Sequence, residues 1–276
     1  MKKMRKKSMT ALLLSVTIIL NCSNVFAKDG DVGLQIEMLP WEKVYKILPK
    51  YSKFTVLDVE TGKMFHVQRR AGSRHADVQP LTPQDTSIMK KIYGGKWSWK
   101  RRAIIVIHDN QWIAASMHGM PHGAGALKNN FPGHFCIHFY GSQTHRTNSM
   151  DLSHKLMILK AAGKLQEYVS GADPFELIRA YVAGFKQQDS LIISAISLQH
   201  IDWAKKTHCV ENINLNRMTV LPFNDYANAI NLTVPVEIEW IDQQSNRKYF
   251  KGNIHLYRLS PTDPWKIDSN HFLKEL

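Results

Sequence analysis

The chain has 276 residues, of which 36 are lysine or arginine and 23 are aspartate or glutamate, giving a formal net charge of +13. This length is enough for one large domain or two modest ones. The basic residues are scattered and match no zinc-finger or RNA-binding pattern, so the charge does not indicate a nucleic-acid partner.

Residues 1–27 have the pattern of a cleavable signal peptide. Basic residues crowd the first seven positions, an apolar stretch covers 11–20, and Ala27 precedes the expected cleavage point. The apolar stretch is too short for a bilayer core of roughly 30 Å, so we expect no stable membrane span after cleavage. Cys22 leaves a lipoprotein as an alternative. We expect a secreted, extracellular or cell-wall-associated protein, whose basic surface suits peptidoglycan or another anionic wall polymer.

Residues 28–163 are predicted to form a strand-rich domain. Apolar runs on either side of turn signals predict β-hairpins over 54–67 and 102–117. Thr82 followed by Pro83 predicts the start of a helix, which should end near Gly94. The other predicted elements here are a strand at 134–140 and a helix at 150–162.

Residues 164–276 show a different pattern, with helices first and long strands after them. Helices are predicted over 173–185 and 191–198, and strands over 234–241 and 248–258. This order, closing on a Trp-Lys-Ile-Asp segment, resembles the NTF2-like domains of exported bacterial proteins. The resemblance implies a pocket between a helix and a curved sheet. The expected fold class is α+β, a strand-rich domain followed by a helix-plus-curved-sheet domain.

Histidines are concentrated in one window around Cys136. The chain has 13 histidines in total. The members of the window are His118, His122, His134, His138 and His145. Even spacing would place only one or two histidines there, so this window is the strongest functional signal in the sequence.

Side chains of the strand around Cys136 should alternate between two faces. The apolar set is Phe135, Ile137 and Phe139, and the reactive set is His134, Cys136 and His138. We expect the apolar set to face a core and the reactive set to share the opposite face. The alternative is a buried structural cysteine between two ordinary histidines. Cys209 lies in the other predicted domain, so we expect two separate thiols rather than a disulfide.

A thiol beside histidines suits nucleophilic catalysis. The thiol is mostly protonated at neutral pH, and a neighbouring imidazole can accept its proton and later protonate a leaving amine. Backbone N–H groups near a glycine-rich turn can stabilise the oxyanion that forms during acyl transfer. Gly123 and Gly133 lie in such turns, on either side of a loop that ends just before Cys136.

The spacing of these residues resembles the L,D-transpeptidases of the YkuD type, which cross-link bacterial cell walls. That family carries His-Gly, followed some 14 to 17 residues later by Ser-His-Gly-Cys-Ile/Val-Arg. Here Cys136 follows His122-Gly123 by 14 positions, with His134 in register. Three positions depart from the pattern: Gly133 replaces Ser, Phe135 replaces Gly and His138 replaces Arg. The surrounding sequence also resembles secreted Gram-positive wall proteins.

The resemblance implies roles for individual residues. Cys136 would be the nucleophile, His134 the base, and His122 the upstream histidine that lines the site. The expected substrate-binding residues are His138, His118, Gly123, Gly133 and His145. The implied function is a cysteine peptidyltransferase that acts on peptidoglycan stem peptides and needs no cofactor.

Two other functions fit the same residues. The first is a zinc-dependent wall peptidase with His134, Cys136 and His138 as ligands. His118, His122, His145, or His75 with Asp77, could complete its shell. Residues two apart on one strand lie nearly 7 Å apart, so all three strand residues would rarely share one ion. Asp77 could otherwise orient a catalytic histidine. The second alternative is a wall-binding module without catalysis.

Overall fold

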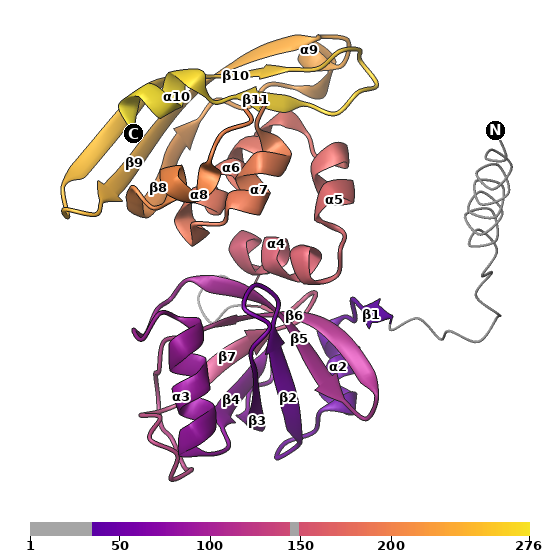
Figure 1. The fold of residues 1–276 in the computed structure, drawn as a ribbon. Coiled ribbons are helices and arrows are strands. Elements are labelled where there is room, and N and C mark those ends of the chain that lie inside the picture. The colour runs from indigo at the N-terminus through magenta and orange to yellow at the C-terminus, as the bar shows by residue number, and fades with distance from the viewer. Residues whose placement is uncertain (1–34, 144–148) are drawn as a thin grey trace, which may run out of the picture. The chain divides into compact units, whose positions relative to one another are not determined.

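Six strands of the first half of the chain close into a barrel (Figure 1). The computed structural model describes residues 35–143 and 149–276. The barrel order is β6-β5-β2-β3-β4-β7, and β7 pairs back onto β6 with every neighbour antiparallel. The strands are β2 (Lys53–Asp58), β3 (Met64–Ala71), β4 (Ala76–Pro80), β5 (Arg101–His108), β6 (Gln111–His118) and β7 (Phe135–His138). A short strand, β1 (Ile36–Glu37), lies parallel to β6.

Both predicted hairpins are present. β2 pairs with β3, and β5 pairs with β6 from Arg101 opposite His118 to His108 opposite Gln111. Asp109 and Asn110 connect β5 to β6 with φ angles of 45° and 65°. Asparagine and aspartate tolerate this left-handed backbone better than other residues with a Cβ, which explains their presence in a two-residue turn.

Two helices accompany the barrel. They are α2 (Trp41–Ile47) and α3 (Pro83–Ile92). Helix α3 begins where the sequence predicts: the Thr82 hydroxyl accepts the N–H of Asp85, and the Asp85 carboxylate accepts the N–H of Thr82. This capping box satisfies two otherwise unpaired backbone donors. The barrel core contains alternate residues of the strands together with Phe135, Ile137 and Phe139.

The second half contains helices followed by an antiparallel four-stranded sheet, of order β11-β10-β9-β8. The helices are α4 (Leu152–Ala161), α5 (Leu165–Gly171), α6 (Pro174–Gln187), α7 (Ser190–Ile196), α8 (Trp203–Thr207), α9 (Phe223–Tyr226) and α10 (Asn270–Glu275). The strands are β8 (Val210–Met218), β9 (Asn231–Asp242), β10 (Arg247–Tyr257) and β11 (Lys266–Asp268). Alternate residues of β9, from Val234 to Trp240, are buried, as the sequence pattern predicts.

Helix α4 lies between the barrel and the rest of the second half. It packs on β5 and β6 on one side and on α6 on the other. Ala103 of β5 and Ala114 of β6 belong to the same buried apolar cluster as Leu156 of α4 and Leu177 of α6. Small residues on the barrel strands let the helix approach closely.

The structure thus confirms a mixed helix-and-strand chain with a strand-rich first half, and it defines that half as a closed barrel. The L,D-transpeptidase-like and NTF2-like identities and the boundary at 163 stay predictions. The predicted signal peptide, residues 1–27, lies outside the described residues. Strands β4 and β8 were not predicted: β4 alternates between apolar and polar residues but has only five residues and ends on Pro80, and the alternation of β8 is interrupted by pairs of adjacent polar residues.

Candidate active site

The candidate site lies on β7, the strand that closes the barrel. Cys136 on β7 pairs with Asp77 on β4, and His138 pairs with Ser116 on β6. Phe135 and Ile137 face the barrel core, as the alternation predicts. The side chains of Cys136 and His138 therefore face the opposite side, where other segments bury them.

The sulfur of Cys136 contacts the ring of His122, which is oriented to accept a proton from the thiol. Its Sγ lies 3.3 Å from Nε2 of His122. The other ring nitrogen of His122, Nδ1, lies 3.1 Å from the carbonyl oxygen of Met120. A carbonyl oxygen can only accept, so Nδ1 carries the proton and Nε2 presents its lone pair to the thiol. This is the arrangement that a cysteine nucleophile, its base and an acceptor that orients the base would need.

His122 is held in place by the segment that contains Cys136. The backbones of His122 and His134 exchange two hydrogen bonds, both of 2.9 Å. Gly123 and Gly133 beside them have φ angles of 60° and 127°. A Cβ at Gly123 would lie 2.4 Å from the His134 ring, and one at Gly133 would lie 2.5 Å from the His122 carbonyl oxygen. Both positions therefore require glycine for the loop to reach the strand.

Asp77 is the acidic member of the site. Its Oδ1 lies 3.6 Å from Sγ of Cys136, so Asp77 and His122 are alternative acceptors of the single thiol hydrogen, and the same oxygen lies 3.1 Å from Nε2 of His75. Nε2 of His134 lies 3.9 Å from the same oxygen. Burial alone would raise the pKa of the Asp77 carboxyl, but His75 and His134 lower it overall. Asp77 is therefore a carboxylate at neutral pH.

The Cys136 thiol is only 3% exposed. Burial raises its pKa, and the nearby Asp77 charge and hydrogen bond raise it further. The resting thiol is therefore protonated at neutral pH. A reaction at this sulfur needs a base that removes the proton as the bond to the substrate forms, and His122 is in position to do so.

Further aromatic rings surround this centre. His138 stacks on His75 and on His154, with ring centroids 4.6 and 3.8 Å apart. His118 lies 5.2 Å from His122, and Trp99 covers both rings. Burial, with the neighbouring histidines, lowers the pKa of His118 well below its usual value.

The structure brings together most of the site residues that were predicted from the sequence. His118, His122, His134 and His138 all lie around Cys136, while His145 lies outside the described residues. His134 was predicted as the base, but its ring nitrogens contact Asp77 and the Ala124 carbonyl, and it is His122 that lies 3.3 Å from the sulfur. Sequence reasoning missed His154, which reaches the site from α4 and bonds to Ser116.

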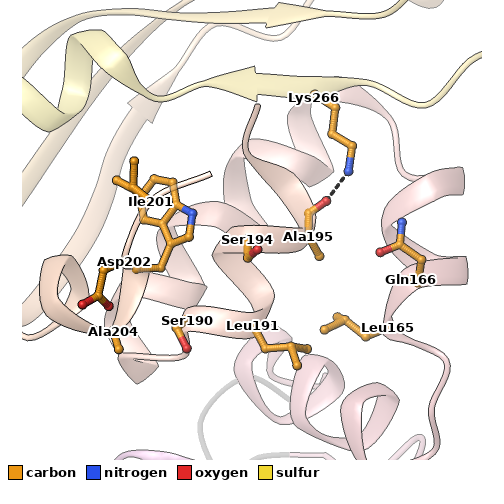
Figure 2. Close-up of a pocket in the computed structure, with 11 residues that line it drawn as sticks. Leu165, Gln166, Ser190, Leu191, Ser194, Ala195, Ile201, Asp202, Ala204 and Lys266 are labelled. Atoms are coloured by element: carbon orange, nitrogen blue, oxygen red, sulfur yellow. Dashed lines mark hydrogen bonds between the residues drawn. The ribbon is translucent and has the colours of Figure 1, made fainter. Parts of the chain in front are cut away.

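A separate pocket, away from Cys136, lies in the second half of the chain (Figure 2). Its lining comes from α5, α7, α8 and β11, and it encloses about 700 Å³. Lys266 points across it and donates to the Ala195 carbonyl. The space between α6 and the sheet, where the NTF2-like resemblance implies a pocket, holds the buried rings of Tyr181, Phe185 and Phe272.

The chain was compared with protein-family models, with curated proteins and with solved structures, and none of the three comparisons gives a match. Within the described part of the chain, none of the helices combines the length and the apolar character needed to cross a membrane.

Proposed function

We propose that the protein is an exported cysteine peptidyltransferase that acts on peptidoglycan stem peptides, as its resemblance to the L,D-transpeptidases implies. The observation that supports this most is the 3.3 Å contact between Cys136 Sγ and His122 Nε2, with Nδ1 of His122 held by the Met120 carbonyl. In this proposal the base is His122 rather than His134.

The reaction begins with transfer of the thiol proton to Nε2 of His122 while the sulfur attacks the carbonyl carbon of a peptide bond. The resulting imidazolium donates that proton to the leaving amine as the carbon–nitrogen bond breaks, leaving a thioester on Cys136. An acceptor amine or a water molecule then attacks the thioester. His122 removes its proton, and the sulfur leaves and regains a proton.

Access to the sulfur involves Trp99. The thiol is buried, whereas Trp99 is half-exposed and its ring lies over His118 and His122. Trp99 lies in the segment before β5, outside the regular strands of the barrel. Displacement of its ring would expose the His122 ring, which contacts Cys136, without moving the strands of the barrel.

The test is covalent labelling of the protein with a carbapenem, which acylates the cysteine of L,D-transpeptidases. We expect one adduct on Cys136, located by mass spectrometry of the digested protein. Cys209 provides a matched control because it is exposed and lies far along the chain. Cys209→Ser should label like the unmodified protein, and Cys136→Ser should not label.

An adduct on Cys209 alone, or none under conditions that label a known transpeptidase, would contradict the proposal. A protein that forms no adduct could still bind purified peptidoglycan. If Cys136→Ala then bound it equally well, a non-catalytic wall-binding module would be favoured instead.

A metal hydrolase is a second candidate, and the donor atoms around Cys136 favour it. Cys136 belongs to three sets of three potential ligands, and within each set the donor atoms lie within 4.8 Å of one another. The sets are His75 with His138, His118 with His122, and Asp77 with His134, each together with Cys136. His134 and His138 thus belong to different sets. In the second set, Nδ1 of His118 is buried without a hydrogen-bond partner among the described residues. Two histidines and a thiolate suit zinc.

Cobalt substitution distinguishes the two candidates. A metal site at this set predicts one Co²⁺ per chain, with a near-ultraviolet sulfur-to-cobalt charge-transfer band that disappears in Cys136→Ser and weakens in His118→Ala. The exposed His66→Ala is the matched control and should leave the band unchanged. No band in the unmodified protein, together with carbapenem labelling that a chelator does not alter, would exclude the metal hydrolase.

A further inference from the structure

A groove of mixed polar and apolar lining lies next to the Cys136–His122 pair. Its volume is about 410 Å³. Its lining comes from the segment before β5, the loop after β6, the end of α6 and the start of β8, and includes Trp97, Trp99, Lys100, Arg101, Met120 and Lys186.

Two of these residues connect the groove to the candidate active site. The carbonyl oxygen of Met120 accepts the hydrogen bond that orients His122. The ring of Trp99 lies 5.5 Å from the ring of His122. A molecule bound in the groove therefore lies against groups that contact the proposed base.

Positive charge dominates the groove. Lys100, Arg101 and Lys186 line it, against a single acidic lining residue, Glu211. Burial lowers the pKa of both lysines, and the charge of Arg101 lowers that of Lys186 further. Arg101 has an acidic neighbour in Asp151, at 3.6 Å. Glu211 partly offsets the effect of burial on Lys100. Cations that are partly removed from water gain stability when an anion binds beside them.

The groove also offers a flat apolar surface. Trp99 is 50% exposed, although it is one of the largest apolar side chains. Trp97, by contrast, packs edge-on against Phe131 at the barrel core. An exposed indole next to cations suits a ligand that presents a ring with an apolar face and also carries negative charge.

We propose that this groove binds an acidic glycopeptide, with a sugar ring on Trp99 and a carboxylate between Lys100 and Lys186. The assignment of the glycopeptide as the acyl donor rests on the proposed function, but its binding does not. A polymer of glycerol phosphate would satisfy the cations and would leave Trp99 without a ring to stack on.

The experiment measures the affinity of the full chain for a disaccharide–tetrapeptide released from peptidoglycan, by calorimetry at low salt. Lys100→Gln with Lys186→Gln should weaken binding about tenfold, and the loss should shrink to about threefold or less in 0.5 M NaCl. The control is Lys248→Gln with Lys251→Gln on β10, which removes the same charge from exposed positions. Equal affinities of the two double variants would overturn the proposal.

Two further measurements test the sugar contact. Trp99→Ala should weaken binding of the disaccharide–tetrapeptide about fivefold and that of the free tetrapeptide less than about twofold. Equal losses for both ligands would overturn the assignment of the sugar to Trp99. Polyglycerol phosphate should bind more weakly than the disaccharide–tetrapeptide, and equal or tighter binding would show an anionic-polymer site instead.

Carbapenem labelling keeps the two proposals distinguishable. Labelling of the unmodified protein reports on acylation of Cys136, and calorimetry of the lysine variants reports on the groove. If the unmodified protein binds the glycopeptide but Cys136 cannot be acylated, the groove proposal is supported and the proposed transferase function is contradicted. If Cys136 is acylated and the lysine variants bind like the unmodified protein, the groove assignment fails alone.

Discussion

Replacing His122 by alanine should slow acylation of Cys136 about 10²- to 10⁴-fold, the range that a positioned general base contributes. The thiol is buried beside Asp77, which keeps it protonated at neutral pH. Without Nε2 of His122 at 3.3 Å, the acceptor left beside the thiol is the Asp77 carboxylate at 3.6 Å, whose lowered pKa makes it a weaker base than an imidazole. The measurement is the second-order rate of carbapenem acylation, followed by intact mass.

His134→Ala is the matched control for this prediction. His134 is the residue that the family resemblance makes the base, yet its ring is directed to Asp77 and to the Ala124 carbonyl. We expect it to slow acylation less than His122→Ala does. A larger loss in His134→Ala, with both variants folded by thermal unfolding, would return the base role to His134.

The largest expected effect on stability comes from Asp58. This carboxylate is fully buried at the end of β2 and accepts two hydrogen bonds from Arg102, of 2.7 and 2.8 Å. Thr61 donates two more, from its N–H and its hydroxyl, to the same carboxylate. Asp58→Ala removes all four and leaves the Arg102 charge partly buried, so it should lower the free energy of unfolding by about 3–5 kcal/mol. Urea unfolding followed by circular dichroism measures the loss.

A surface ion pair provides the comparison. Glu237 and Lys251 lie 3.2 Å apart on β9 and β10, and the lysine side chain is almost wholly exposed. Glu237→Ala should change the unfolding free energy by less than about 1 kcal/mol. If Asp58→Ala and Glu237→Ala had similar effects, the four hydrogen bonds of Asp58 would contribute much less than their burial implies.

Local sequence patterns predicted the local parts of the fold. The Asp109-Asn110 turn, the Thr82 cap and the alternation of β9 depend on neighbouring residues, and all three are present. Closure of the barrel could not be predicted, because it depends on pairing β7 with both β4 and β6, which are distant in the chain. No residue pattern within β7 encodes its partners.

The candidate site was likewise predictable only where it depends on the sequence of a single strand. Alternation along one strand predicted that Cys136 and His138 would share a face, opposite Phe135 and Ile137. Which histidine contacts the sulfur could not be predicted, because this depends on the path of the loop that carries His122. The placement of Asp77 and His154 depends on packing of β4 and α4 against β7 and β6.

The position of α4 limits how the chain can be divided. A fragment ending at residue 163 would keep this helix on β5 and β6 but remove α6, its other neighbour. Four consecutive apolar residues of α4, from Leu156 to Leu159, are buried, so the helix buries apolar side chains on more than one side. Loss of α6 would leave part of that surface in water, where apolar patches promote association between molecules. An isolated barrel would therefore need polar substitutions on α4 to remain monomeric.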